Sequence, residues 1–169
     1  GVIRNMSTST GTNSITGPIT LAAASEINSD ANILSFSSAA TISTTASNYG
    51  LTFGGAGTVS ALGVISGGGS ITASSALASS TNSLTLSTYG AVSVAGITSG
   101  TLAITGTGIT LNGNITTSGT QTYTGAVTLG GSVTAASTGG SSTGNTISFG
   151  SSVNGAQALV VDAGVGAIS

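Results

Sequence analysis

The feature that most constrains the fold of this chain is a recurring pair of apolar residues separated by one small or polar residue. This period of two is typical of a β-strand with one buried face, because successive side chains of a strand point to opposite sides. Each pair therefore predicts one short strand. The pairs are Ile19/Leu21, Leu34/Phe36, Leu51/Phe53, Leu84/Leu86, Val92/Val94, Leu102/Ile104, Ile109/Leu111, Val127/Leu129, Ile147/Phe149 and Leu159/Val161.

Turn-forming residues separate these pairs. The chain has 28 Gly and one Pro, and Gly occurs in clusters such as Gly54-Gly55, Gly67-Gly68-Gly69 and Gly130-Gly131. Glycine adopts positive φ angles at little steric cost, which suits tight turns between short strands. No segment shows the i, i+3, i+4, i+7 apolar stripe of an amphipathic helix. We therefore predict an all-β fold with no substantial helix.

The spacing of the pairs predicts a β-solenoid. Intervals between pairs cluster at about 7 to 10 and at about 15 to 20 residues, as expected when several strands form one turn of a coil and the pattern then repeats. At roughly 19 residues per turn, the 169 residues would form about nine rungs. Each rung buries its apolar face only against neighbouring rungs. We expect residues 1–169 to be a single solenoid segment, excerpted from a longer repeat protein.

The near absence of charged side chains argues against many functions. The chain has one basic residue, Arg4, three acidic residues, Glu26, Asp30 and Asp162, and no His or Cys. Nucleic-acid binding needs several Lys or Arg to neutralise phosphates, and acid/base catalysis needs tuned titratable groups. We therefore predict that the protein is not an enzyme, holds no cofactor or metal, and binds no nucleic acid. No apolar run approaches the length of a membrane helix, so we expect no membrane insertion.

Several segments resemble repeats of bacterial surface proteins. Ile3–Met6 (IRNM), Gly17–Leu21 (GPITL), Glu26–Asp30 (EINSD) and Gly50–Gly57 (GLTFGGAG) look like passenger repeats of autotransporter-associated β-strand proteins. Gln121–Gly130 (QTYTGAVTLG) is similar to repeats of filamentous-haemagglutinin-like surface proteins. The resemblance implies a right-handed parallel β-helix, secreted to the bacterial surface, that serves as a stalk, an adhesin or a fibre. These families provide no catalytic motif to transfer.

Fold and composition together predict a structural or adhesive role. A nearly neutral surface gives little repulsion between copies, which favours assembly. We predict a segment of an extracellular filament that self-associates by stacking of rungs. The predicted partners are the protein itself, stacked axially or laterally, and glycans of a host or neighbouring cell. The predicted location is extracellular, at the bacterial cell surface.

Two alternatives remain open. A pilin-like subunit assembled by strand donation would also be rich in Thr, Gly and Ala and nearly uncharged. A polysaccharide-binding or polysaccharide-cleaving β-helix would need clustered carboxylates and aromatic rings, and Glu26 and Asp30 are the candidate carboxylate pair. The simpler explanation is that both carboxylates belong to a solvated turn around Asn28 and Ser29.

The aromatic residues divide into two groups. Each Phe closes an apolar pair and is predicted to lie in the core; these are Phe36, Phe53 and Phe149. Each Tyr flanks Gly or Thr and is a candidate for surface contact, since a tyrosine combines apolar area with a polar end. The candidate contact residues are Tyr49, Tyr89 and Tyr123.

Thr-x-Thr motifs suggest one further hypothesis about function. They occur at Thr8/Thr10, Thr105/Thr107 and Thr120/Thr122/Thr124. An ordered Thr array on a flat solenoid face is how some ice-binding proteins contact their ligand. Because the motifs do not recur at a constant interval, the high β-propensity of Thr explains them more simply.

Overall fold

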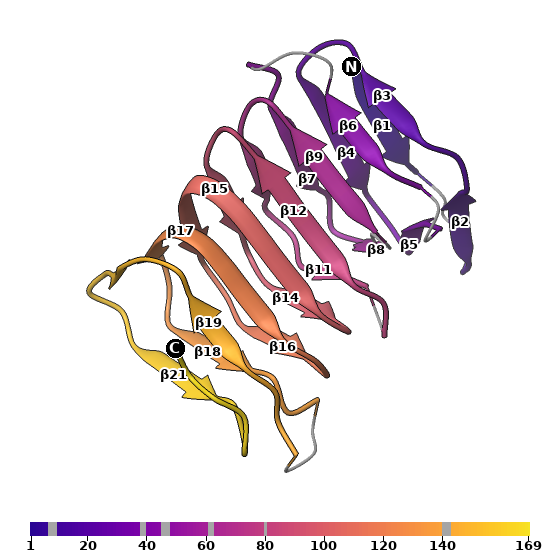
Figure 1. Cartoon of the computed structure of the whole chain (residues 1–169). Coiled ribbons are helices and arrows are strands. Elements are labelled where there is room, and N and C mark those ends of the chain that lie inside the picture. Colours follow the sequence, from indigo (N-terminus) through magenta and orange to yellow (C-terminus); the bar gives the residue numbers. More distant parts are fainter. Residues whose placement is uncertain (7–9, 38–39, 45–47, 61–62, 80, 140–142) are drawn as a thin grey trace.

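In a computed structural model the chain forms a parallel β-solenoid, which confirms the predicted fold class. Strands β6, β9, β12, β15, β17 and β19 follow one another along the axis (Figure 1). The structure describes residues 1–6, 10–37, 40–44, 48–60, 63–79, 81–139 and 143–169. Within these ranges there is no helix, and hence none that could cross a membrane.

Three faces run along the solenoid, and strand pairing defines them. The first face contains β1 (Val2–Asn5), β4 (Ser25–Ser29), β7 (Leu51–Gly54), β10 (Ile71–Ala73), β13 (Val92–Val94) and β20 (Val153–Asn154). The second face contains β2 (Thr12–Ile15), β5 (Ile33–Phe36), β8 (Thr58–Ser60), β11 (Leu77–Ala78), β14 (Ile97–Ser99), β16 (Ile115–Thr117), β18 (Val133–Ala136) and β21 (Leu159–Asp162). The third face contains β3 (Ile19–Leu21), β6 (Ile42–Thr44), β9 (Val64–Gly67), β12 (Leu84–Thr88) and β19 (Ile147–Phe149).

Two long strands, β15 (Leu102–Leu111) and β17 (Gln121–Leu129), belong to two faces each. Their first halves pair on the third face and their second halves on the first face. The bend in β17 lies at Gly125, which has a φ of 136°. A Cβ atom at this position would collide with the carbonyl oxygen of Gly106 in β15. This corner therefore requires glycine for two reasons: the φ angle is positive, and there is no room for a side chain.

Turn length varies while strand pairing stays regular. The turn 92–109 is shorter than the turn 27–53, although each ends at the register partner of its first residue. Among the described residues the second face contains eight strands. The expectation of nine rungs was slightly too high, because turns such as 27–53 are longer than the interval of roughly 19 residues on which it was based. Every strand pair between described residues is parallel, which does not fit the antiparallel sheets of a pilin-like sandwich.

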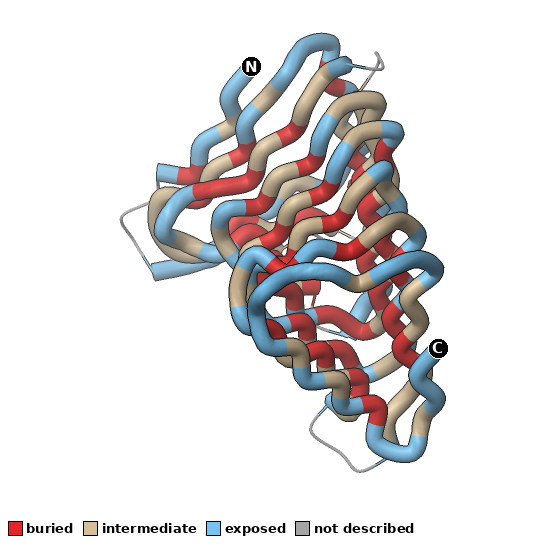
Figure 2. Tube along the Cα trace, turned by 90° about the vertical axis from the view of Figure 1, so that its left-hand side faces the viewer, coloured by how far each residue is buried: buried red, intermediate tan, exposed pale blue. Residues whose placement is uncertain are grey.

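The core consists of stacked inward-facing residues, and buried positions recur from turn to turn (Figure 2). All the predicted apolar pairs lie in strands. The column of the first face is Ile3, Ile27, Phe53, Ala73, Val94, Leu111 and Leu129. The column of the second face is Leu34, Val59, Leu77, Ile97, Ile115, Ala135 and Val161. The column of the third face is Ile19, Ile42, Ile65, Leu86, Ile104, Tyr123 and Phe149.

Most of the buried hydrophobic residues lie in these columns. Burying one Leu or Ile side chain contributes about 1.5–3 kcal/mol. Phe36 and Phe53 are buried, as predicted. Phe149 is partly buried and packs against the core, where its ring stacks on that of Tyr123 with 5.0 Å between the ring centroids. The aromatic core positions expected for all three Phe residues are therefore confirmed.

Candidate functional site

Hydroxyl side chains form an unbroken outward row on the third face. The inward positions of its strands are occupied mainly by core residues, so the alternate positions face outward, and the strand register aligns them from turn to turn. We call this row the third-face ladder: Thr20, Ser43, Ser66, Ser87, Thr105 and Thr124. Adjacent members are one strand spacing apart, about 4.8 Å.

The other two faces carry similar rows. The first-face ladder is Thr52, Thr72, Ser93, Thr110 and Thr128. The second-face ladder is Ser14, Ser35, Ser60, Thr98 and Thr116, and Ala78 interrupts it between Ser60 and Thr98. Each face of the solenoid therefore presents uncharged hydroxyl groups at regular axial intervals.

Sequence analysis missed these ladders for a geometric reason. Thr20 and Ser43 are neighbours in the third-face ladder, and so are Ser87 and Thr105, but the first two lie further apart in the sequence than the second two. Variable turn length thus hides the alignment. Both Ser and Thr also occur in each ladder, so no single residue type marks it. Thr8, in the first Thr-x-Thr motif, lies outside the described residues.

Three of the charged side chains, Arg4, Glu26 and Asp30, form ion pairs or hydrogen bonds with nearby residues. Arg4 Nη2 lies 2.7 Å from Asp30 Oδ2, and Arg4 Nε donates a hydrogen bond to the same oxygen at 2.9 Å. Glu26 Oε1 accepts a hydrogen bond from Asn28 Nδ2 at 2.7 Å. Among the described residues, no group of three or more metal-ligating side chains comes together. Glu26, Asn28 and Ser29 lie in strand β4, and Ser29 is buried, so the expected solvated turn is wrong for these residues; only Asp30 follows the strand.

The three candidate contact tyrosines have different surroundings. Tyr89, directly after β12, is 85% exposed, and Tyr49, shortly before β7, is half-buried. Both lie at the corner between the third and first faces. Tyr123 is fully buried, so the expectation that it lies on the surface is wrong. It occupies an inward position of β17, between Ile104 and Phe149 in the core column of the third face.

Tyr123 anchors a buried polar network. Its hydroxyl donates a hydrogen bond to Gln121 Oε1 at 2.8 Å. Gln121 Nε2 donates in turn to Thr117 Oγ1 at 3.2 Å and to the carbonyl oxygen of Ala136 at 2.8 Å. Burial raises the pKa of the Tyr123 phenol far above its usual value. The network is therefore neutral and links β16 and β18 of the second face to the first half of β17 on the third face.

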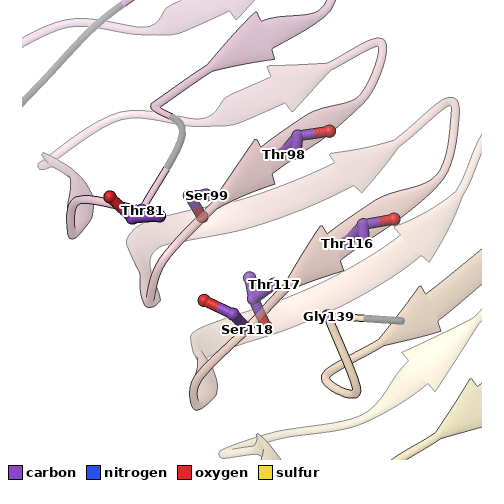
Figure 3. A pocket seen from close by; sticks show the side chains of 7 residues that line it. All are labelled: Thr81, Thr98, Ser99, Thr116, Thr117, Ser118 and Gly139. Atoms are coloured by element: carbon purple, nitrogen blue, oxygen red, sulfur yellow. The ribbon is translucent and has the colours of Figure 1, made fainter. Parts of the chain in front are cut away.

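A second set of hydroxyls lies inside the solenoid, at the corner that follows the second face. It consists of one residue from each of four successive turns, all of them buried: Ser79, Ser99, Thr117 and Ser137. A pocket of about 290 Å³ lies at this corner. Its lining is Thr81, Thr98, Ser99, Thr116, Thr117, Ser118 and Gly139 (Figure 3).

Comparison with known proteins does not identify the chain. No family model matches it, and neither the curated proteins nor the solved structures give a match. The likeness to autotransporter and haemagglutinin repeats therefore stays a prediction. Inferences about function depend on the fold, the ladders and the pocket.

Proposed function

We propose that this chain is a structural or adhesive segment of an extracellular filament at the bacterial cell surface. The observation that carries the proposal is the third-face ladder, in which the six strands from β3 to the first half of β17 present hydroxyl groups without a break. Repeated weak contacts along one body add up to strong attachment when they can form together. A regular, uncharged face is suited to contact with further copies of the chain or with neutral glycans.

Axial stacking is the first mode of assembly that we propose. Among the described residues, β1 pairs only with β4 and β21 pairs only with β18, so each strand has one open edge. Open strand edges recruit further strands. Exposed apolar side chains accompany these edges: Val2 and Met6 at one end, and Val160, Val165 and Ile168 at the other. Further turns, from this or another polypeptide, would satisfy both features.

Electron microscopy of the purified chain across a concentration series tests axial stacking. We expect filaments that lengthen with concentration and have an axial repeat at a multiple of about 4.8 Å. Val160→Lys places a charge on the last strand of the second face and should shorten the filaments. Val64→Lys makes the same change in β9, where strands pair on both sides, and should leave filament length unchanged. Short rods at every concentration would rule out axial stacking.

Lateral contact through the hydroxyl ladders is the second mode of assembly that we propose. The double variant Ser66→Lys/Ser87→Lys adds two adjacent charges to the third-face ladder, while Ser35→Lys/Ser60→Lys does the same on the second face. If the third face makes the adhesive contact, the first variant should lose lateral bundling and attachment to immobilised neutral glycans, and the second should retain them. Equal loss in both variants would indicate general charge repulsion instead.

The polysaccharide-cleaving alternative has little support from the site. Glu26 is hydrogen-bonded to Asn28 and Asp30 is paired with Arg4, and neither lines the pocket. Glu26→Gln/Asp30→Asn should therefore change no glycan-directed activity. A loss of reducing-end release from a polysaccharide by this variant would revive the alternative.

A further inference from the structure

Tyr89 presents an aromatic ring to solvent at the edge of the third face. It is 85% exposed, more than any other large hydrophobic side chain among the described residues. Thr88, the last residue of β12, is buried, and side chains alternate along an extended chain, so Tyr89 faces outward as Ser87 does. A tyrosine in this position offers an apolar ring and a polar hydroxyl to a partner.

The backbone on both sides of Tyr89 is fixed by hydrogen bonds. The hydroxyl of Thr88 donates to the carbonyl oxygen of Gly69 and accepts from the N–H of Gly90 at 3.1 Å. The N–H of Tyr89 donates to the carbonyl oxygen of Gly67 at 3.3 Å. A side chain on a fixed backbone loses little conformational freedom on binding, because a tyrosine has only two χ angles to order.

The space beside this ring is open toward the preceding turn. Thr88 is the register partner of Gly67, so Tyr89 lies next to Gly68 of that turn. The segment there is Gly67-Gly68-Gly69, which carries no side chain that could cover the ring. The two turns are one strand spacing apart, about 4.8 Å. A flat molecule can therefore approach the ring over the glycine turn.

Hydroxyl groups of the third-face ladder lie on the same surface, within reach of solvent. Ser87 precedes Tyr89 by two residues, which is about 6.6 Å along an extended chain. Its neighbours in the ladder are Ser66 and Thr105. Ser66 and Ser87 are partly exposed and Thr105 is exposed. A molecule that contacts the ring can thus also exchange hydrogen bonds with the ladder, because hydroxyls both donate and accept.

The chemistry of this surface limits what that molecule can be. The chain has no charged residue between Asp30 and Asp162, so the surface lacks the groups that hold ions or phosphates. The aromatic ring favours a flat apolar face, and the hydroxyls favour a polar rim. A β-linked glucose unit has both features, because all its ring hydroxyls are equatorial and its two faces present C–H groups. A mannose unit has an axial hydroxyl, which interrupts one face.

We propose that Tyr89 stacks on a β-linked glucose unit of a neutral glycan, while hydroxyls of the third-face ladder hydrogen-bond the rim of that glycan. The inference rests on the proposed function and deepens it, since it names an anchor residue and a sugar for the third-face contact. The ring holds one sugar unit, and the ladder adds weaker contacts to the units that follow.

Titration of the single chain with cellotetraose, a soluble chain of β-linked glucose, tests the proposal by NMR. We expect saturable shifts of the Tyr89 ring, the Gly68 amide and the Thr105 methyl group. The dissociation constant should be on the order of millimolar, because only one sugar ring is stacked. The corresponding β-linked mannotetraose should bind more weakly. This readout needs no filament, so sugar binding can succeed where filament formation fails, and the reverse.

Two variants of Tyr89 and one matched control make the test specific. Tyr89→Ala removes the ring and should weaken the binding of cellotetraose by about tenfold. Tyr89→Phe keeps the ring and should bind almost as well as the original chain. Ile33→Ala shortens an exposed apolar side chain of β5 on the second face and should leave binding unchanged. Unfolding midpoints of all variants, measured in parallel, separate loss of binding from loss of folding.

Three results would overturn the proposal. The first is the absence of saturable shifts with cellotetraose, and the second is equal weakening in Tyr89→Ala and Tyr89→Phe, which would assign the contact to the hydroxyl rather than to the ring. The third is a Tyr89→Ala variant that still attaches to immobilised neutral glycans as the original chain does, while Ser66→Lys/Ser87→Lys does not. This last result would remove the anchor assigned to Tyr89 but leave the proposed third-face contact in place.

Discussion

The N-terminal turns, from β1 to β6, differ from the central turns, from β12 to β18, in length and in what occupies their corners. The corner after β1 and β4 is held by polar side chains. Asn5 Nδ2 donates to Ser29 Oγ at 3.2 Å and to the carbonyl oxygen of Ala31 at 3.0 Å, and Asn13 Nδ2 donates to Asn5 Oδ1 at 2.6 Å. The central turns have a short corner at a different place, between the third and first faces, where β17 is a continuous strand that bends at Gly125.

This difference shows that two kinds of corner are compatible with one strand register. A longer corner can vary in length because side-chain amides and hydroxyls satisfy its backbone groups. A short corner depends on a glycine backbone, because no side chain fits between the adjacent turns. We therefore expect the central turns to be sensitive to changes in backbone conformation and the N-terminal turns to be sensitive to loss of buried polar contacts.

The largest expected effect is that of Gly125→Ala in the central turns. The positive φ and the collision with Gly106 should destabilise the protein by about 3 kcal/mol. Gly108→Ala, near the same bend, and Gly17→Ala, in the N-terminal turns, both place the new methyl group in open space. Urea unfolding followed by circular dichroism compares the three. Similar midpoints for all of them would contradict the role assigned to the short corner.

Loss of the Tyr123 hydroxyl should have the next largest effect. Tyr123→Phe leaves Gln121 Oε1 buried without its donor and should cost about 1–3 kcal/mol. Gln121→Leu/Tyr123→Phe replaces both partners by apolar groups, and Leu84 and Leu102 already occupy the positions that align with Gln121. We expect the double variant to be more stable than Tyr123→Phe alone in the same urea experiment. A double variant that is less stable would show that the network is required as a unit.

The same tyrosine predicts a dependence of stability on pH. Its pKa is raised in the folded protein, whereas in the unfolded chain it is about 10. Between these two values the folded state binds more protons than the unfolded state, so the free energy of unfolding falls as pH rises. The stability should be intact below about pH 10 and decrease above it. Urea midpoints across this range should change less for Tyr123→Phe, and an identical decrease would assign the effect to other groups.

The smallest expected effect is that of Arg4→Ala in the N-terminal turns. The Arg4–Asp30 pair is partly exposed, with side-chain exposures of 52% and 30%. Its loss should cost at most about 0.5 kcal/mol, and less at high salt. Asn5→Ala, which removes the buried amide of the same strand, serves as the comparison and should cost more. An equal or larger effect of Arg4→Ala would mean that the ion pair, rather than the amide network, stabilises this corner.

The strands were predictable where both inward residues are large and apolar; β10 and β18 were missed because Ala73 and Ala135 fill one of their inward positions. Pairs such as Leu84/Leu86 and Ile109/Leu111 follow the period of two, and each lies in a strand. The first half of β17 was not recognised as a strand, because its inward residues are Gln121 and Tyr123. Tyr123 was also assigned to the surface, because a sequence does not show which partner satisfies its hydroxyl.

The ladders and the pocket depend on information that spacing does not contain. Ser66 and Ser87 become neighbours only once the register between β9 and β12 is known, and turn lengths set that register. Ser99 has a buried hydroxyl without a hydrogen-bond partner, whereas the hydroxyl of Thr117, at the equivalent position of the next turn, both donates and accepts a hydrogen bond. The sequence does not show this difference. Regular backbone pairing with irregular corners therefore explains both the success and the failure of prediction.

The unequal turns have a consequence for how such a protein can change over time. The long turn 27–53 and the shorter turn 92–109 each advance the axis by one strand spacing, about 4.8 Å. Insertions and deletions at the corners alter the outline of one turn but leave the axial positions of all the others unchanged. The length of the rod is thus counted in turns rather than in residues, and corners can diversify without disturbing the distance between points of attachment.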